Sequence, residues 1–150
     1  MTRRFVVTLV ALACLMGASC RACMQREYDG NVRVVNFQHT GAGVGASDHE
    51  ALKRGVQEGL EKAGFEAKHP CIWNVINARL LYSQGVFYGI DFELQAWCKP
   101  SGQSWNQKLE VRTSEFFGNR TDVTPKELYS KLPERVGLSL AHVDLPRKMP

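Results

Sequence analysis

The stretch from Cys71 to Cys98 reads CIWNVINARLLYSQGVFYGIDFELQAWC, and apolar and polar residues alternate along most of it. A period of two residues is typical of a strand that buries one face. The first half, from Ile72 to Leu81, is expected to be one such strand. The second half is the cleaner one, and its expected buried face is apolar throughout, at Val86, Tyr88, Ile90, Phe92, Leu94 and Ala96.

A tight turn is expected between the two halves, at Ser83-Gln84-Gly85, because Gly85 can take a positive φ. We therefore expect a long antiparallel hairpin. Folding the chain about residue 84 sets residue 71 near residue 97, so Cys71 and Cys98 fall at the open end of the hairpin. Paired cysteines of a secreted chain form disulfides, and we expect one here that joins the strand ends.

The N-terminus has the pattern of a secretory signal. Met1 to Arg4 is basic, Phe5 to Met16 is almost wholly apolar, and small residues follow up to Cys20. The apolar run is shorter than the roughly 20 residues that span a bilayer. We predict that residues 1–20 are a signal peptide, with cleavage after Cys20 or after Ala22, and that the chain is secreted, with no membrane anchor after cleavage. A bacterial lipoprotein signal ending at Cys20 is the alternative, although Gly17 stands where such signals usually carry Leu.

The composition is that of one ordinary globular domain, with 150 residues, 44% of them apolar and 23% charged. The net charge is +4, and losing Arg3 and Arg4 with the signal leaves 17 basic and 15 acidic residues. So small a surplus gives no case for a nucleic-acid partner. No motif places a nucleophile beside a base, so we expect no enzymatic activity. We also expect no cofactor and no metal site, because no ligand spacing joins the scattered histidines, His39, His49, His69 and His142.

A helix is expected from Ser47 to about Ala63, ahead of the hairpin. It opens with the capping-box pattern Ser-Asp-His-Glu, in which the serine hydroxyl and the glutamate carboxylate each bond a backbone amide. Gly55 and Gly59 would let this helix approach a sheet closely, and Gly64 is a natural stop. Apolar residues recur at helical spacing and make one narrow stripe, at Leu52, Val56, Leu60 and Ala63.

Shorter segments flank the helix and the hairpin. Asn31 to Gln38 is rich in β-branched residues and predicts a first strand. The glycine-rich run from Gly41 to Gly45 lacks the Lys-Ser/Thr of a phosphate-binding loop and indicates a flexible connector. Lys108 to Thr113 alternates again and predicts another strand, which Phe116-Phe117-Gly118-Asn119 would end in a second turn.

The last thirty residues predict less regular structure. Thr124-Pro125-Lys126-Glu127 is a second capping box, which indicates a short helix from Pro125 to Leu132. Val136 to Val143 is expected to be a last strand in an otherwise irregular tail. Asn119-Arg120-Thr121 is an N-glycosylation sequon, so Asn119 is a candidate glycan site if the source is a eukaryote.

These elements predict an α+β fold with one helix packed on a curved antiparallel β-sheet. Residues 1–20 would be the signal peptide, and residues 21–46 would be an N-terminal segment with the first strand and the glycine run. Residues 47–150 would be the folded domain with its irregular tail.

The order of elements resembles the cystatin superfamily, most closely from Gly45 to Cys98. Val86 to Leu94, following Gly85, is similar to the strand after the first inhibitory hairpin of cystatins, and Cys98 is similar in place to a cysteine shortly after that strand. The resemblance implies a cystatin-like fold and a secreted inhibitor of papain-like cysteine proteases. Such inhibitors fill the protease cleft with a rigid edge and perform no chemistry.

The resemblance also implies which residues would bind a protease. In the family an N-terminal glycine, a first hairpin turn and a second hairpin turn form the edge. Here the glycine falls at Gly45 or its neighbours Gly41 and Gly43, and the two turns fall on Leu81, Tyr82, Ser83, Gln84 and Gly85 and on Phe116 and Phe117. The first turn keeps only the last glycine of the family pattern Gln-x-Val-x-Gly, and the second keeps an aromatic residue but not the proline of Pro-Trp. The alternative is a non-inhibitory secreted binding module of the same fold.

Overall fold

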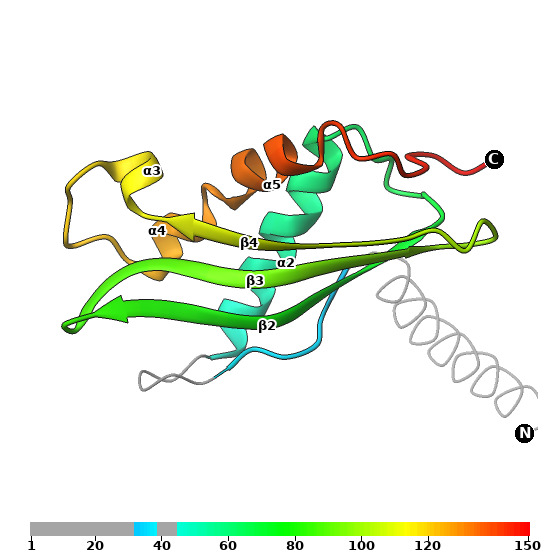
Figure 1. Ribbon diagram of the computed structural model, residues 1–150. Helices are drawn as coiled ribbons and strands as arrows, with labels where there is room; N and C mark the ends of the chain where they lie inside the picture. The colour runs from blue at the N-terminus through cyan, green and yellow to red at the C-terminus, as the bar shows by residue number, and fades with distance from the viewer. Residues whose placement is uncertain (1–31, 39–44) are drawn as a thin grey trace, which may run out of the picture. The chain divides into compact units, whose positions relative to one another are not determined.

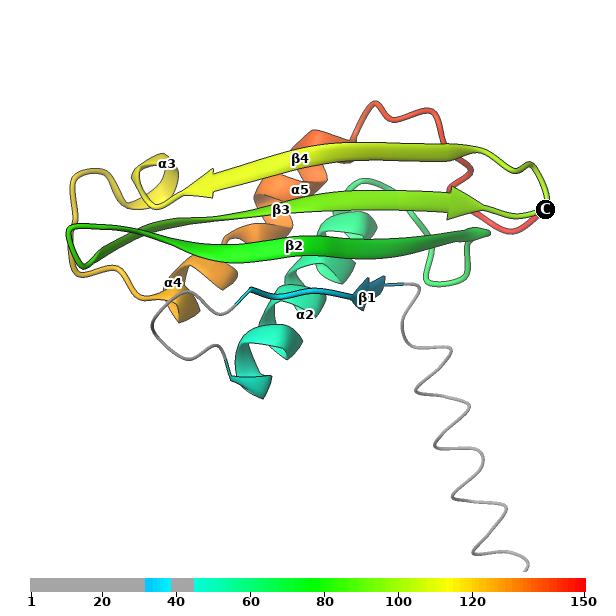
Figure 2. The same ribbon diagram turned by 60° about the horizontal axis from the view of Figure 1, so that its bottom comes forward.

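The computed structural model describes residues 32–38 and 45–150. The expected signal peptide and the glycines before Gly45 lie outside these residues. Four strands form one sheet in the order β1-β2-β3-β4, and Figures 1 and 2 show α2 and α5 together on one face of it. The α+β class is therefore confirmed. The elements are β1 (Val32–Val34), α2 (Ala46–Lys62), β2 (Cys71–Ser83), β3 (Val86–Cys98), β4 (Ser104–Arg112), α3 (Ser114–Phe117), α4 (Pro125–Tyr129) and α5 (Leu132–Leu140).

The β2–β3 hairpin forms as the alternation predicts. Ser83 pairs with Val86 at the turn, and Cys71 pairs with Cys98 at the open end. The expected disulfide joins these two cysteines, with an S–S distance of 2.00 Å. β4 then pairs antiparallel with β3 and contains the expected strand from residue 108, although it begins four residues earlier.

Two irregularities in the hairpin change which side chains face the core. The β2–β3 register shifts between Ile76 and Arg79, and Asn77 takes a positive φ of 53°. An extra residue in one strand moves the following side chains to the opposite face. Trp73 and Val75 are therefore buried before the shift, and Ala78 and Leu80 after it.

A second shift, between Leu81 and Tyr82, lies near the tip. Because of this shift, the prediction of the buried face of β3 is wrong at that end of the strand. Val86 is 38% exposed and Tyr88 is partly exposed, while Phe87 is buried in their place. From residue 90 onward the predicted face is the buried one.

The sheet is mixed, so the prediction of an antiparallel sheet is wrong at its first strand. β1 runs parallel to β2, with Val32 opposite Trp73, and Phe37 adds an isolated parallel bridge to Ala78. Parallel neighbours need a crossover connection, and α2 supplies it, because β1, α2 and β2 follow one another along the chain. The expected strand within residues 31–38 is confirmed over its three residues from Val32.

α2 carries the predicted apolar stripe, and Leu52, Val56 and Leu60 are all buried. Its start differs from the prediction. The N-cap is Gly45 and not Ser47, because the Asp48 carboxylate accepts a hydrogen bond from the Gly45 backbone N–H at 2.9 Å. The helix ends as expected before Gly64, which has a φ of +93°.

The structure has four helices among its described residues, so the prediction of a single helix packed on the sheet is wrong. The expected strand from Val136 to Val143 is replaced by α5, which reaches Leu140. Residues 141–150 are irregular, as expected. Leu132, Val136 and Leu140 recur every fourth residue and are fully buried, which is the spacing of one helix face. The expected helix from residue 125 is α4, which ends at Tyr129.

α5 packs against α2 through the glycines that were expected to face a sheet. A Cβ built at Gly55 would lie 2.8 Å from the Cβ of Leu132, and one at Gly59 would lie 2.6 Å from the Cβ of Val136. The two helices therefore approach each other at these glycines. They form a second layer over the buried face of the sheet, where Trp73 and Leu94 are fully buried.

Candidate functional site

The tip of the β2–β3 hairpin is a two-residue turn. Gln84 and Gly85 both have a positive φ, of 50° and 76°, as in the type I′ turns that match the twist of paired strands. Residues 82–86 are exposed, and Figure 2 shows the tip at the end of the sheet, beyond α2 and α5. A Cβ at Gly85 would meet no atom within 4 Å. The tip is therefore open to a partner.

Cross-strand contacts support the tip. The ring of Tyr82, which is 39% exposed, lies 5.6 Å from the ring of buried Phe87, measured between centroids. Closer to the middle of the hairpin, the Arg79 Nε–H donates to both oxygens of Asp91, at 2.8 and 2.9 Å. Such pairs stabilise neighbouring strands. The tip is thus carried on a ribbon whose shape is set before any partner binds.

Gly45 begins α2 and is linked to α4 through one carboxylate. Asp48 accepts from the Gly45 N–H through one oxygen, and its other oxygen accepts from the Tyr129 hydroxyl at 3.0 Å. Burial raises the pKa of the Tyr129 phenol far above its ordinary value, and the hydrogen bond to Asp48 and the nearby Tyr82 raise it further. The Tyr129 phenol is therefore protonated at neutral pH, and its hydroxyl links α4 to the start of α2.

Phe116 and Phe117 lie in the short helix α3, so the expected second turn is wrong as a description of this segment. The Thr113 N–H donates to the Tyr88 carbonyl, and the Phe117 N–H donates back to the Thr113 carbonyl, both at 2.9 Å. The chain thus coils after β4 and forms no further strand among the described residues. Both phenylalanines are partly buried against the core, and the Arg120 guanidinium lies 5.5 Å from the Phe117 ring centroid.

The predicted site residues fall into three groups. Leu81 to Gly85 are together at the tip, with Leu81 partly buried. Phe116 and Phe117 lie at the same end of the sheet, as Figure 1 shows. Gly45 is on another element and is joined to this end through Asp48 and Tyr129. Asn119 is exposed just after α3.

Asp48 and Tyr129 were not predicted from the sequence as members of the site. They are 81 positions apart, and no local pattern links residues so distant. The capping box that places α4 was the only available signal. In the structure it forms as predicted, with the Thr124 N–H donating to the Glu127 carboxylate at 2.8 Å.

Residues 32–38 and 45–150 contain no cluster of three or more His, Cys, Asp or Glu side chains able to hold a metal ion. Within the same residues, no helix has both the length and the apolar character needed to cross a membrane. A scan of protein-family models found no match to the chain. Searches of curated proteins and of solved structures found no match either.

Proposed function

We propose that this chain is a secreted, non-catalytic binding module that inserts the β2–β3 tip into a groove of another protein. The observation that carries the proposal is the exposed two-residue turn at Gln84 and Gly85, at the end of two paired 13-residue strands. A binding element that is already ordered loses little conformational entropy when it binds. Secretion, which the proposal includes, rests on residues 1–20 and agrees with a disulfide.

The groove to test first is the active-site cleft of a papain-like cysteine protease. The resemblance of Gly45 to Cys98 to cystatins supports this choice, and so does the helix that packs across the sheet beside a long hairpin. The tip and α3 lie at the same end of the sheet (Figure 1), where an edge made of several segments would have to form. Tyr82 would supply an aromatic contact to that edge, since it is 39% exposed.

Two observations favour the alternative, a binding module that does not inhibit proteases. β1 runs parallel to β2, which departs from an antiparallel cystatin-like sheet. The expected second hairpin turn is replaced by α3, so an inhibitory edge made of a glycine and two hairpin turns would lose one of its three parts. A glycan on exposed Asn119 would also stand beside α3 and obstruct entry into a deep cleft.

The test is an inhibition titration of papain-like proteases with the mature chain. We expect inhibition at micromolar concentration or better. Ser83→Arg places a large cation on the exposed tip without changing a buried contact, and it should weaken inhibition by about tenfold or more, as losses at central contact residues do. Gly85→Glu should weaken it as well.

The matched control is Leu138→Arg, which adds the same side chain at a 76% exposed position of α5. It should inhibit like the unmodified chain. An equal loss in Ser83→Arg and Leu138→Arg would exclude the tip as the binding element. Full protease activity with several papain-like enzymes, with the chain deglycosylated and untreated, would exclude inhibition and leave the non-inhibitory module.

A further inference from the structure

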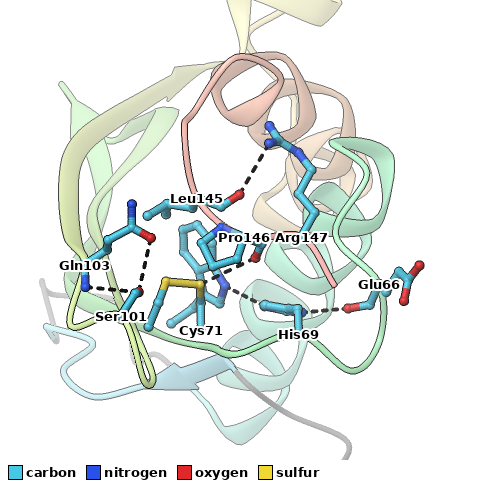
Figure 3. Close-up of a disulfide and its surroundings, with 10 residues drawn as sticks. Glu66, His69, Cys71, Ser101, Gln103, Leu145, Pro146 and Arg147 are labelled. Atoms are coloured by element: carbon cyan, nitrogen blue, oxygen red, sulfur yellow. Dashed lines mark hydrogen bonds between the residues drawn. A yellow bond between two sulfur atoms is a disulfide. The ribbon is translucent and has the colours of Figure 1, made fainter. Parts of the chain in front are cut away.

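A cleft of about 680 Å³ lies at the open end of the hairpin, away from the tip. Three segments far apart in the sequence form it: the α2–β2 connection, the β3–β4 turn and the last residues of the chain. Figure 3 shows how these segments converge around the Cys71–Cys98 disulfide. The volume falls within the range of small-molecule sites in proteins, about 300–1,000 Å³.

The C-terminal wall of this cleft is tied to the domain through Arg147. Its guanidinium donates to the carbonyls of Ala63, Leu140 and Ala141, at 3.0, 3.2 and 3.1 Å, and lies over the ring of Phe65, 4.9 Å from the centroid. The Arg147 carbonyl accepts from the Glu66 N–H at 2.8 Å. These bonds hold the segment in place although it has no regular secondary structure.

The opposite wall, the β3–β4 turn, is also bonded on both sides. The Lys99 N–H donates to the Pro70 carbonyl at 3.0 Å, and the Gly102 N–H donates to the Cys98 carbonyl at 2.9 Å. The Cys98 N–H in turn donates to the Gln103 carbonyl at 2.9 Å. Since both walls are bonded to the domain, the cleft exists before a ligand enters.

The surface of the cleft is apolar with a cationic rim. Its lining includes three prolines, a leucine and a methionine, at Pro70, Pro100, Pro146, Leu145 and Met149. Lys99 and Lys148 are exposed on two different walls. Glu66 is the acidic residue of the lining, and Figure 3 shows its side chain directed away from the disulfide and from Pro146. Arg147 uses its guanidinium within the fold, and the Lys99 ammonium lies over the Trp97 ring, 4.9 Å from its centroid. Lys99 and Lys148 are the exposed cations of the lining.

We propose that this cleft binds a single-chain anionic amphiphile of the chemical class of a fatty acid. The aliphatic chain would lie on the proline, leucine and methionine surface, and the carboxylate would meet the ammonium groups of Lys99 and Lys148. The positive charge of the rim favours an anionic headgroup, and the carbon surface favours an aliphatic chain. A compact hydrophilic anion would leave that carbon surface in water.

Calorimetric titration of the mature chain with laurate, below its micelle concentration, tests the proposal. We expect one-to-one binding. Octanoate should bind far more weakly, because each methylene kept from water is worth about fourfold in affinity. Dodecyltrimethylammonium has a similar alkyl chain and the opposite charge, and it should bind at least about tenfold more weakly than laurate.

The double variant Lys99→Glu/Lys148→Glu should lower laurate affinity by about tenfold or more, whereas Lys126→Glu, an exposed lysine of α4, should not. Amide chemical shifts of the unmodified chain give a readout that needs no variant. They should change at residues 64–70, 99–103 and 145–150. Equal affinity for both amphiphile charges, shift changes elsewhere, or no binding at all would each overturn the proposal.

Discussion

His69 uses both of its ring nitrogens in the folded chain. Its Nδ1–H donates to the Glu66 carbonyl at 2.6 Å, and its Nε2 accepts from the Trp73 indole N–H at 2.9 Å. Trp73 is fully buried and His69 is 8% exposed. A proton on Nε2 would remove the acceptor of a buried indole, so the neutral ring is the form that the fold requires.

The stability of the domain should therefore depend on pH through His69. Burial lowers its pKa below the ordinary value of 6.5, and the bond to Glu66 opposes this only in part. The unfolded chain then binds a proton more readily than the folded chain, so this contribution to stability is present above pH 6.5 and is lost as the pH falls through the lowered pKa. Urea unfolding between pH 7.5 and pH 5 measures the effect.

His69→Gln removes the titrating group and should flatten the pH dependence. It should also cost about 1–3 kcal/mol at pH 7.5, if the Trp73 indole N–H loses its acceptor. His142→Gln, at an exposed position, is the matched control and should keep the slope of the unmodified chain. A slope that survives in His69→Gln would assign the pH dependence to other groups.

At the scale of elements, the contact between α2 and α5 depends on having no side chain at two glycines. A Cβ at Gly59 would come within 2.6 Å of Val136, and real Cβ atoms do not approach so closely. An alanine in a helix interior normally gains about 1 kcal/mol over glycine. The clash with a fully buried valine should exceed that gain.

We expect Gly59→Ala to lower the free energy of unfolding by about 1–2 kcal/mol, as overpacking of cores does. Adding Val136→Ala makes room for the new methyl group, so the double variant should be more stable than the sum of the two single changes predicts. Arg54→Ala, on the exposed face of the same helix, is the control and should change little. Strict additivity in denaturant unfolding would contradict the close contact.

The hairpin was predictable because its sequence signals are local. In contrast, α5 was not predictable from its own residues. Val136, Leu138 and Leu140 alternate like a strand, but Leu138 is 76% exposed. Leu132, Val136 and Leu140 also fit a helix, and only the facing glycines of α2 decide between the two patterns. The shift at Asn77 escaped prediction for a related reason, since an extra residue in a strand leaves its composition unchanged.

At the scale of the whole molecule, the parts of the site that depend on local sequence were predictable, and the parts that depend on distant contacts were not. The tip residues are consecutive, so their place was readable from the sequence. Gly45 is linked to that end through Asp48 and Tyr129, which no local pattern connects, and the cleft is built from three distant segments. Sites of this kind become visible only when the chain is folded.

The tip and the cleft lie at opposite ends of one hairpin. Each strand has 13 residues, which corresponds to about 40 Å at the usual rise of an extended chain. Changes farther apart than about 10 Å, with no shared contact, usually have additive effects. The two proposed activities should therefore be independent, even though the disulfide and the tip belong to the same ribbon.

Measuring both activities in the same variants tests this independence. Ser83→Arg should weaken protease inhibition and leave laurate affinity within about twofold, because nothing at residue 83 contacts the cleft. Lys99→Glu/Lys148→Glu should do the reverse, and the combined variant should show the product of the separate effects. If saturating laurate changed the inhibition constant of the unmodified chain by about tenfold, the ribbon would have to transmit a change of shape along its length. The fixed register from Cys71 to Ser83 would then have two arrangements instead of one.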